Sequence, residues 1–211
     1  MAKVEIYSSF ADLKHSDKSK EISDSDALWR TLDLLDTFHA MKNERQRDLH
    51  LNDVLVEICQ ALNNNGVEYL ICGGIAVGFY GYQRQSGGLQ GKPHLDYDVD
   101  IWYKPTNANF FAILKALKAL GHNTSRLDEV VFDKNRTYLK IEIKNYKLDF
   151  LPQMVGIESF NDAYINRTKV LLEQTEIPLI PYQDLISNKK TLNREIDTND
   201  IEQLEKKRKE R

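Results

Sequence analysis

The chain has 211 residues, of which 41% are hydrophobic and 29% are charged, and its formal net charge is −3. This length suits one α/β domain with a helical extension and is enough to bury a real core. The negative net charge argues against nucleic-acid binding by the protein surface as a whole, although a local basic patch is compatible with it. We recognise no signal peptide and no apolar run of membrane-spanning length, which predicts a cytoplasmic protein without a membrane partner.

The N-terminal part of the chain begins with a polar segment and continues with segments whose apolar residues recur periodically. The first twenty or so residues are polar and rich in lysine, and we expect a loosely held terminus there. Residues 27–41 and 52–62 carry apolar side chains at spacings of three and four, which predicts two amphipathic helices. Residues 67–72 predict a strand that ends in a glycine pair and leads into a short helix over residues 75–82.

The remaining elements alternate between strands and helices. After an acidic strand, residues 107–120 predict a helix that Gly121 closes. Alternating apolar residues predict further strands over residues 130–132, 137–143, 146–151 and 168–172. Helical periodicity follows over residues 182–192 and 199–207. The order predicts a mixed α/β (α+β) fold, in which a mixed sheet is flanked by helices and extended by helical segments at both ends.

Three aspartates have the spacing of a metal site on strands. Asp98 and Asp100 alternate with an apolar residue and share one face of their strand, while Asp149 opposes the apolar residues of a later strand. Carboxylate oxygens suit Mg²⁺ or Mn²⁺, and nothing here suits zinc. Two such ions could activate an attacking hydroxyl and stabilise a leaving pyrophosphate. An isolated D-x-D pair is often only a solvated surface feature, so the interpretation depends on the order and setting of the three.

The glycine pair Gly73–Gly74 precedes these aspartates, at the turn from strand to helix. Backbone N–H groups at a helix start point toward an incoming phosphate, and glycine lets the phosphate approach closely. The alternative is a plain strand-to-helix turn, in which glycine only relieves the backbone. The sequence leaves both interpretations open.

The order of strand, Gly-Gly, helix, D-x-D strand and later carboxylate strand resembles the nucleotidyltransferase superfamily that includes DNA polymerase beta. Within it, the pattern G-G-x-A, then arginine, then T-x-D-h-D is similar to the bacterial branch of AbiEii-type toxins and related minimal nucleotidyltransferases, with Arg84 as the arginine. Asp96 departs from this pattern, because it replaces the usual threonine with a fourth acid that could bind metal or cap the strand. Residues 85–95 are an apparent insertion, which we expect to be a mobile loop at the mouth of the site.

A second block near the C-terminus strengthens the resemblance. An Asn-Lys pair ending at Lys189 is followed by the pattern R-x-x-D-x-x-D, which comprises Arg194, Asp197 and Asp200. By this resemblance Lys189 would reach the triphosphate as a point charge. The alternative is that these are solvated helix residues and that Asp197 only caps the last helix.

The resemblance implies a nucleotidyltransferase core over residues 51–175, between an N-terminal segment (residues 1–50) and a C-terminal helical segment (residues 176–211). It implies transfer of a nucleoside monophosphate from an NTP to an acceptor hydroxyl. The implied catalytic and metal-binding residues are Asp98, Asp100 and Asp149. The implied nucleotide-binding residues are Gly73, Gly74, Arg84 and Lys189. RNA, a small molecule and a protein stay open as acceptors, as do a toxin or phage-defence role with an antitoxin partner and a non-catalytic nucleotide-binding or antitoxin-like module.

Two basic runs and two cysteines are further features of the sequence. The run over residues 206–211 ends a helix and is expected to be solvated. A basic series on the strands that lead to the third aspartate, which includes Lys140, is a better candidate for RNA contact. Cys59 and Cys72 lie in apolar settings and are expected to be buried free thiols.

Overall fold

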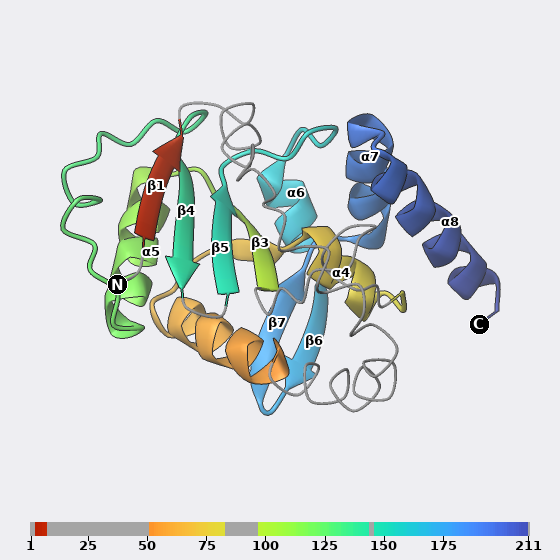
Figure 1. Cartoon of the computed structure of the whole chain (residues 1–211), viewed down its shortest axis with the longest axis horizontal. Coiled ribbons are helices and arrows are strands. Elements are labelled where there is room, and N and C mark those ends of the chain that lie inside the picture. The colour runs from red at the N-terminus through yellow and green to blue at the C-terminus, as the bar shows by residue number, and fades with distance from the viewer. Residues whose placement is uncertain (1–2, 8–50, 83–96, 144–145, 211) are drawn as a thin grey trace, which may run out of the picture.

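The computed structural model describes residues 3–7, 51–82, 97–143 and 146–210, which form a seven-stranded sheet with helices on both faces (Figure 1). The strands are β1 (Lys3–Tyr7), β2 (Tyr69–Ile71), β3 (Tyr97–Tyr103), β4 (Tyr138–Ile143), β5 (Tyr146–Leu151), β6 (Thr168–Leu172) and β7 (Thr175–Leu179). The helices are a helix over residues 51–64, α4 (Gly73–Phe79), α5 (Asn107–Ala119), α6 (Phe160–Ile165), α7 (Tyr182–Leu192) and α8 (Glu195–Lys209).

The sheet is mixed, with the strand order β1-β4-β5-β3-β2-β7-β6. β3 is parallel to β5 and β2 is parallel to β7, whereas the other neighbouring pairs are antiparallel. β4 and β5 form the predicted antiparallel pair, and the predicted turn at residues 144–145 lies outside the described residues. The predicted fold class, a mixed sheet flanked by helices, is confirmed.

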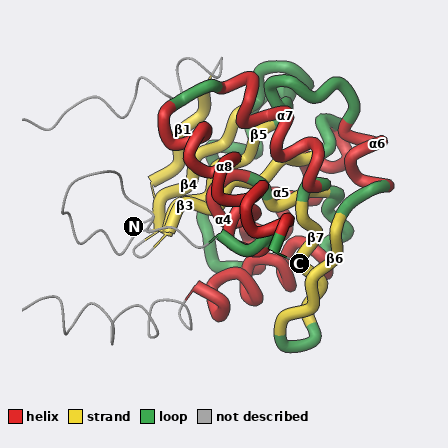
Figure 2. The backbone as a smooth tube through the Cα atoms, turned by 90° about the vertical axis from the view of Figure 1, so that its right-hand side faces the viewer, coloured by secondary structure: helices red, strands yellow, loops and turns green. Residues whose placement is uncertain are grey.

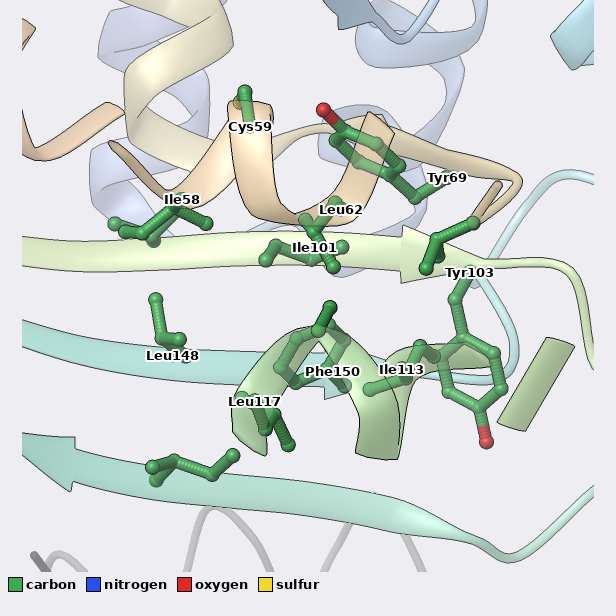
Figure 3. Close-up of a cluster of buried hydrophobic side chains, with 14 of the residues drawn as sticks. Ile58, Cys59, Leu62, Tyr69, Ile101, Tyr103, Ile113, Leu117, Leu148 and Phe150 are labelled. Carbon is green, nitrogen blue, oxygen red and sulfur yellow. The ribbon is translucent and has the colours of Figure 1, made fainter. Parts of the chain in front are cut away.

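One face of the sheet carries a closed apolar core. The helix over residues 51–64 contributes Ile58 and Leu62 to it, and α5 contributes Leu117. Figure 3 shows these side chains gathered against β3 and β5, where Ile101 and Phe150 lie. Each of these side chains is at most 1% exposed. Full burial of such a side chain contributes roughly 1.5–3 kcal/mol, so this core holds β3 and β5 firmly in place.

The opposite face is covered by α4, α6, α7 and α8. Trp102 on β3 meets Phe160 on α6 edge-on, with 5.1 Å between the ring centroids. Leu185 on α7 and Leu204 on α8 belong to the same buried cluster. α7 and α8 lie at the end of the molecule away from β1 (Figure 1), and in the view from that end they lie in front of the strands (Figure 2). This face therefore combines an apolar part under the helices with the polar residues of β3, β4 and β5.

Two segments expected outside the sheet are strands of it. Residues 3–7 are not a loosely held terminus but the edge strand β1, paired along its whole length with β4. Their alternating Val-Glu-Ile-Tyr sequence has strand propensity, and the edge of β4 offers backbone groups to pair. Residues 175–179, most of which fall in the predicted C-terminal helical segment (residues 176–211), form β7 between β2 and β6. β7 pairs with β2 only at Leu179. Pro178, which has no N–H to donate, therefore lies outside the β2–β7 pairing.

The predicted strand over residues 130–132 is wrong, because these residues lie in a loop. Val130 and Phe132 pack against the apolar core, while Val131 between them is 91% exposed. The Phe132 ring lies 5.3 Å from that of Phe110, between centroids. Alternation therefore identified the inward side chains correctly, but strand formation also needs a backbone partner, and no neighbouring strand among the described residues supplies one here.

The C-terminal helices agree closely with prediction. α7 has the predicted limits, and α8 begins four residues before the predicted start, at Glu195. Cys59 and Cys72 are both buried and free, as expected. The predicted helix over residues 27–41 lies outside the described residues. Strand β7 crosses the predicted boundary between core and C-terminal segment at residue 175, and the three-part division of the chain stays a prediction.

Candidate active site on the carboxylate face

The three predicted metal-binding aspartates lie side by side on one face of the sheet. β3 and β5 are neighbouring parallel strands, and their register places Asp100 opposite Asp149, with Asp98 two residues earlier on β3. The intervening Val99 and Leu148 are fully buried in the core of the other face. Neighbouring strands lie about 4.8 Å apart and alternate residues about 6.7 Å apart, so the three backbone positions form a compact triangle. The structure therefore places the three predicted aspartates together on one face of the sheet.

The surroundings of Asp149 favour its protonated form. Burial raises the pKa of this carboxyl to about 7, and the negative charges of Asp100 and Asp98 act in the same direction, against the positive charges of Lys140 and Lys147. Its Oδ1 atom is buried and has no hydrogen-bond partner among the described residues. An ionised carboxylate in this position is costly unless a cation offsets its charge. An additional positive charge at this site would therefore stabilise the ionised form of Asp149.

Lys140 is a site residue whose position the sequence did not reveal. It lies directly across from Asp149 on the neighbouring strand β4 and is only 6% exposed. Its charge lowers the pKa of Asp149 and offsets part of the effect of burial. Because it is buried, Lys140 does not fit the basic series that the sequence offered as a candidate for RNA contact. The usable signal was the hairpin, because residues at equal distances from the turn at residues 144–145 face each other across it.

The first glycine of the pair is required by Asp100. The Cys72 N–H donates to the Asp100 carbonyl oxygen at 3.0 Å, which fixes the turn against β3. Gly73 has φ +61°, and a Cβ there would collide with Oδ2 of the Asp100 carboxylate. Only glycine combines this backbone conformation with so close an approach. Gly74 follows in the first turn of α4, and phosphate binding by the pair stays a prediction.

Lys189 lies in a buried ion cluster between α7 and α8. Its ammonium group is 3.2 Å from Asp197 Oδ1 and 2.6 Å from Asp200 Oδ2, and its side chain is 3% exposed. The aspartates of the predicted R-x-x-D-x-x-D pattern thus hold the predicted nucleotide-binding lysine. Contact between Lys189 and a triphosphate stays a prediction, and it would require the ammonium group to turn from these partners.

Arg194 extends this ion cluster toward the predicted metal-binding aspartates of β3 and β5. Its guanidinium donates from Nε to Asp197 Oδ2 at 2.6 Å and from Nη2 to Asp197 Oδ1 at 2.9 Å. Its pKa is raised, chiefly by this hydrogen bonding and also by the charge of Asp100. Half of its side chain is exposed. Arg194 is therefore a preoriented cation near the carboxylate face, a role for which the sequence had named Arg84 and Lys189.

Several predicted features lie outside the described residues, namely Arg84, Asp96 and the insertion over residues 85–95. Among residues 51–82, 97–143 and 146–210, no three His, Cys, Asp or Glu side chains are already gathered into a metal-binding group. No helix within these ranges is long and apolar enough to cross a lipid bilayer.

No protein-family model and no curated protein matches this chain. Among solved structures, the fold is similar to that of a presumed nucleotidyltransferase from Thermotoga maritima, with a TM-score of 0.45 and 17% sequence identity. The similarity covers 75% of this chain and 92% of the other. At this level the likeness assigns no residue a role, so the function has to be argued from the site itself.

Proposed function

We propose that this protein is a metal-dependent nucleotidyltransferase that moves a nucleoside monophosphate from an NTP to an acceptor hydroxyl and releases pyrophosphate. The observation that carries the proposal is the row of Asp98, Asp100 and Asp149 on adjacent parallel strands, beside a glycine turn packed against Asp100. The sequence resemblance to the nucleotidyltransferase superfamily, which includes these same residues, agrees with it. The narrower AbiEii-like assignment and a toxin or phage-defence role rest on that resemblance alone.

The three carboxylates fit Mg²⁺ or Mn²⁺ in donor chemistry and in backbone placement. All their donor atoms are oxygens, which these ions prefer, and the buried Oδ1 atom of Asp149 has no hydrogen-bond partner among the described residues. Their side chains do not yet form a closed ligand set, so binding would draw them together by side-chain rotation on a rigid sheet. When bound, such ions would supply charge neutralisation at the reacting phosphate and activation of the acceptor hydroxyl.

Individual residues of the site have distinct roles in the proposed reaction. Asp149, whose buried Oδ1 atom has no hydrogen-bond partner among the described residues, would hold the ion that activates the acceptor hydroxyl. Gly73 lets the turn approach the Asp100 carboxylate closely, and the backbone N–H groups of this turn would bind phosphate oxygens. Arg194, held in place by Asp197, would offer its remaining N–H groups to phosphate oxygens. Catalysis would then consist of positioning and charge stabilisation.

A non-catalytic nucleotide-binding or antitoxin-like module of the same fold is the alternative. It predicts NTP binding without transfer. The presence of all three carboxylates in one register favours the enzyme, because phosphate binding alone gains nothing from three neighbouring acids.

The test is incorporation of label from α-³²P-labelled NTPs with Mg²⁺ or Mn²⁺ into fractionated cell extract. RNA, protein and small-molecule fractions are analysed separately. We expect Asp98→Asn and Asp100→Asn to lower incorporation by at least a hundredfold, about 2.7 kcal/mol in barrier. Asp128→Asn is the matched control, because this aspartate forms an exposed ion pair with Lys118 away from the site.

Two outcomes would overturn the proposal. Full activity of the Asp98→Asn, Asp100→Asn double variant would show that these carboxylates take no part in the reaction. A wild-type protein that binds NTP in equilibrium dialysis but labels no fraction would establish the non-catalytic alternative.

A further inference from the structure

A groove opens between α7 and α8 where α7 begins and α8 ends. It consists of two adjoining hollows of about 420 and 340 Å³ that share Tyr182, Gln183 and Arg208 as lining residues. Tyr80, the residue that caps the end of α4, lines the smaller hollow. We call this feature the α7–α8 groove. Each hollow has the size of a small-molecule site, and together they make an elongated one.

The groove has an aromatic wall with an unsatisfied hydroxyl. The Tyr182 ring packs edge-on against Tyr80, with 5.3 Å between the centroids, which fixes its orientation. The Tyr80 hydroxyl is bonded to Thr168 and to the carbonyl of Ile180. By contrast, the Tyr182 hydroxyl is buried and has no hydrogen-bond partner among the described residues. A buried polar atom of this kind is normally paired, and a ligand in the groove could pair it.

The groove is also positively charged. The larger hollow is lined by Lys190, Arg208 and Lys209 against a single acid, Glu205, which leaves two net positive charges. The Arg208 guanidinium lies 4.9 Å from the centroid of the Tyr182 ring. This concentration contrasts with the net charge of −3 for the whole chain. An anionic ligand is therefore attracted to this part of the surface in particular.

We propose that the α7–α8 groove binds a single-stranded RNA segment, which makes RNA the acceptor class of the proposed transferase. An ordered aromatic ring beside arginine and lysine is how proteins hold single strands, because bases stack on the ring while cations bind the backbone phosphates. A ribose 2′-hydroxyl can both donate and accept, so it can pair the Tyr182 hydroxyl. Two adjoining hollows accommodate successive nucleotides better than a single free nucleotide.

The position of the groove connects it to the carboxylate face. Tyr80 lies at the end of α4, and Gly73, which packs against Asp100, lies at its beginning. A seven-residue helix is roughly 10 Å long. A strand held in the groove could thus extend along α4 toward the aspartates. This functional link rests on the proposed transferase activity, whereas RNA binding itself does not.

The test measures RNA binding alone, by fluorescence anisotropy of an unstructured 12-nucleotide RNA, with EDTA and without NTP. The Lys190→Gln, Arg208→Gln double variant should bind at least tenfold more weakly. Its salt dependence should fall by about 1.4 in slope, as expected for two lost phosphate contacts to a single strand. The matched control is Lys115→Gln, Lys118→Gln on α5, which removes the same charge from the other face of the sheet and should change the affinity less than threefold.

Tyr182 variants separate stacking from charge. Tyr182→Leu should weaken binding about tenfold without changing the salt slope, because it removes one stacked base contact. Tyr182→Phe should keep the stacking and reduce the preference for RNA over DNA of the same sequence. Urea unfolding of each variant establishes that it is folded under the binding conditions.

The proposal is overturned if the groove double variant and the α5 control bind RNA equally. It is also overturned if poly-glutamate competes as well as RNA at equal charge, which would identify an acidic protein segment as the ligand, or if a mononucleotide binds as tightly as the 12-mer. Because the assay needs neither metal nor NTP, any of these results leaves the transferase activity to be judged by labelling alone.

Discussion

Asp149 and Asp197 are both withdrawn from water, yet their surroundings act on them in opposite ways. At Asp149, burial and the neighbouring Asp100 and Asp98 raise the pKa to about 7. At Asp197, burial alone would raise the pKa, but the hydrogen bond from Arg194 and the charge of Lys189 outweigh it, and the pKa is lowered. At Asp197 the cations outweigh burial, whereas at Asp149 burial and the neighbouring acids outweigh the positive charges of Lys140 and Lys147.

Under the proposed function, this difference separates a structural acid, Asp197, from a functional one, Asp149. A protein gains little stability from placing like charges together, so a row of acids on a rigid sheet is most useful when an external cation completes it. A buried ion cluster with internal partners instead joins two elements in one arrangement, here α7 and α8. Breaking each region should therefore have different consequences.

The largest effect should come from breaking the C-terminal cluster. Lys189→Met leaves Asp197 and Asp200 buried with less compensation and should destabilise the protein by about 3–5 kcal/mol. The adjacent, exposed Lys190 is the control, and Lys190→Met should change stability by no more than about 0.5 kcal/mol. Urea unfolding followed by circular dichroism measures both. Equal stability of the two variants would show that the cluster does not hold the helices.

The next effect concerns the close packing at Asp100. Gly73→Ala places a Cβ against the Asp100 carboxylate at a positive φ and should cost about 2–3 kcal/mol. Gly78, in the same short helix, has open space where a Cβ would lie, with no atom within 4 Å, so Gly78→Ala should be neutral or stabilise by up to about 1 kcal/mol. Thermal melts of both variants without metal decide this. A harmless Gly73→Ala would contradict the packing described for the turn.

A divalent cation should stabilise only the sheet site. At ten times its Kd, Mg²⁺ or Mn²⁺ should add about 1.4 kcal/mol, equivalent to a Tm increase of roughly 3–6 °C. Asp98→Asn, Asp100→Asn should abolish this increase, while the surface variant Asp128→Asn should retain it. An unchanged response in the double variant would place the metal elsewhere.

The last effect is the pH dependence of stability that Asp149 causes in EDTA. Its folded pKa of about 7 exceeds the ordinary value of 3.8, so the folded state binds an extra proton between these values. Stability should therefore fall as the pH rises from about 4 to about 7, and Asp149→Asn should remove this slope. Asp197 has the opposite sign, because its lowered pKa favours folding above 3.8 and this contribution is lost on acidification. Urea unfolding at pH 5 and pH 8 measures the slope, and an identical slope in wild type and Asp149→Asn would contradict it.

Local patterns in the sequence were sufficient for the elements around the site. Alternation of apolar and acidic residues predicted that Asp98 and Asp100 share a face, and it predicted β5 with its observed limits. These features depend on the two-residue period of a strand, which is a property of a few consecutive residues. The wrongly predicted strand over residues 130–132 shows the limit of the same argument. Its apolar residues alternate because two of them pack on the core, but no described strand pairs with their backbone.

Which charges meet was decided only by the tertiary structure. Strand order and register place Asp149 beside Asp100 and Lys140 beside Asp149, and the packing of α7 on α8 places Lys189 between two acids. Local periodicity determines which face a side chain occupies but carries no information on which distant segment lies next to it. That depends on long-range pairing of backbone groups and on burial shared across the whole sheet. The amino-acid sequence by itself thus determined the acids and their strands, and the fold determined their partners.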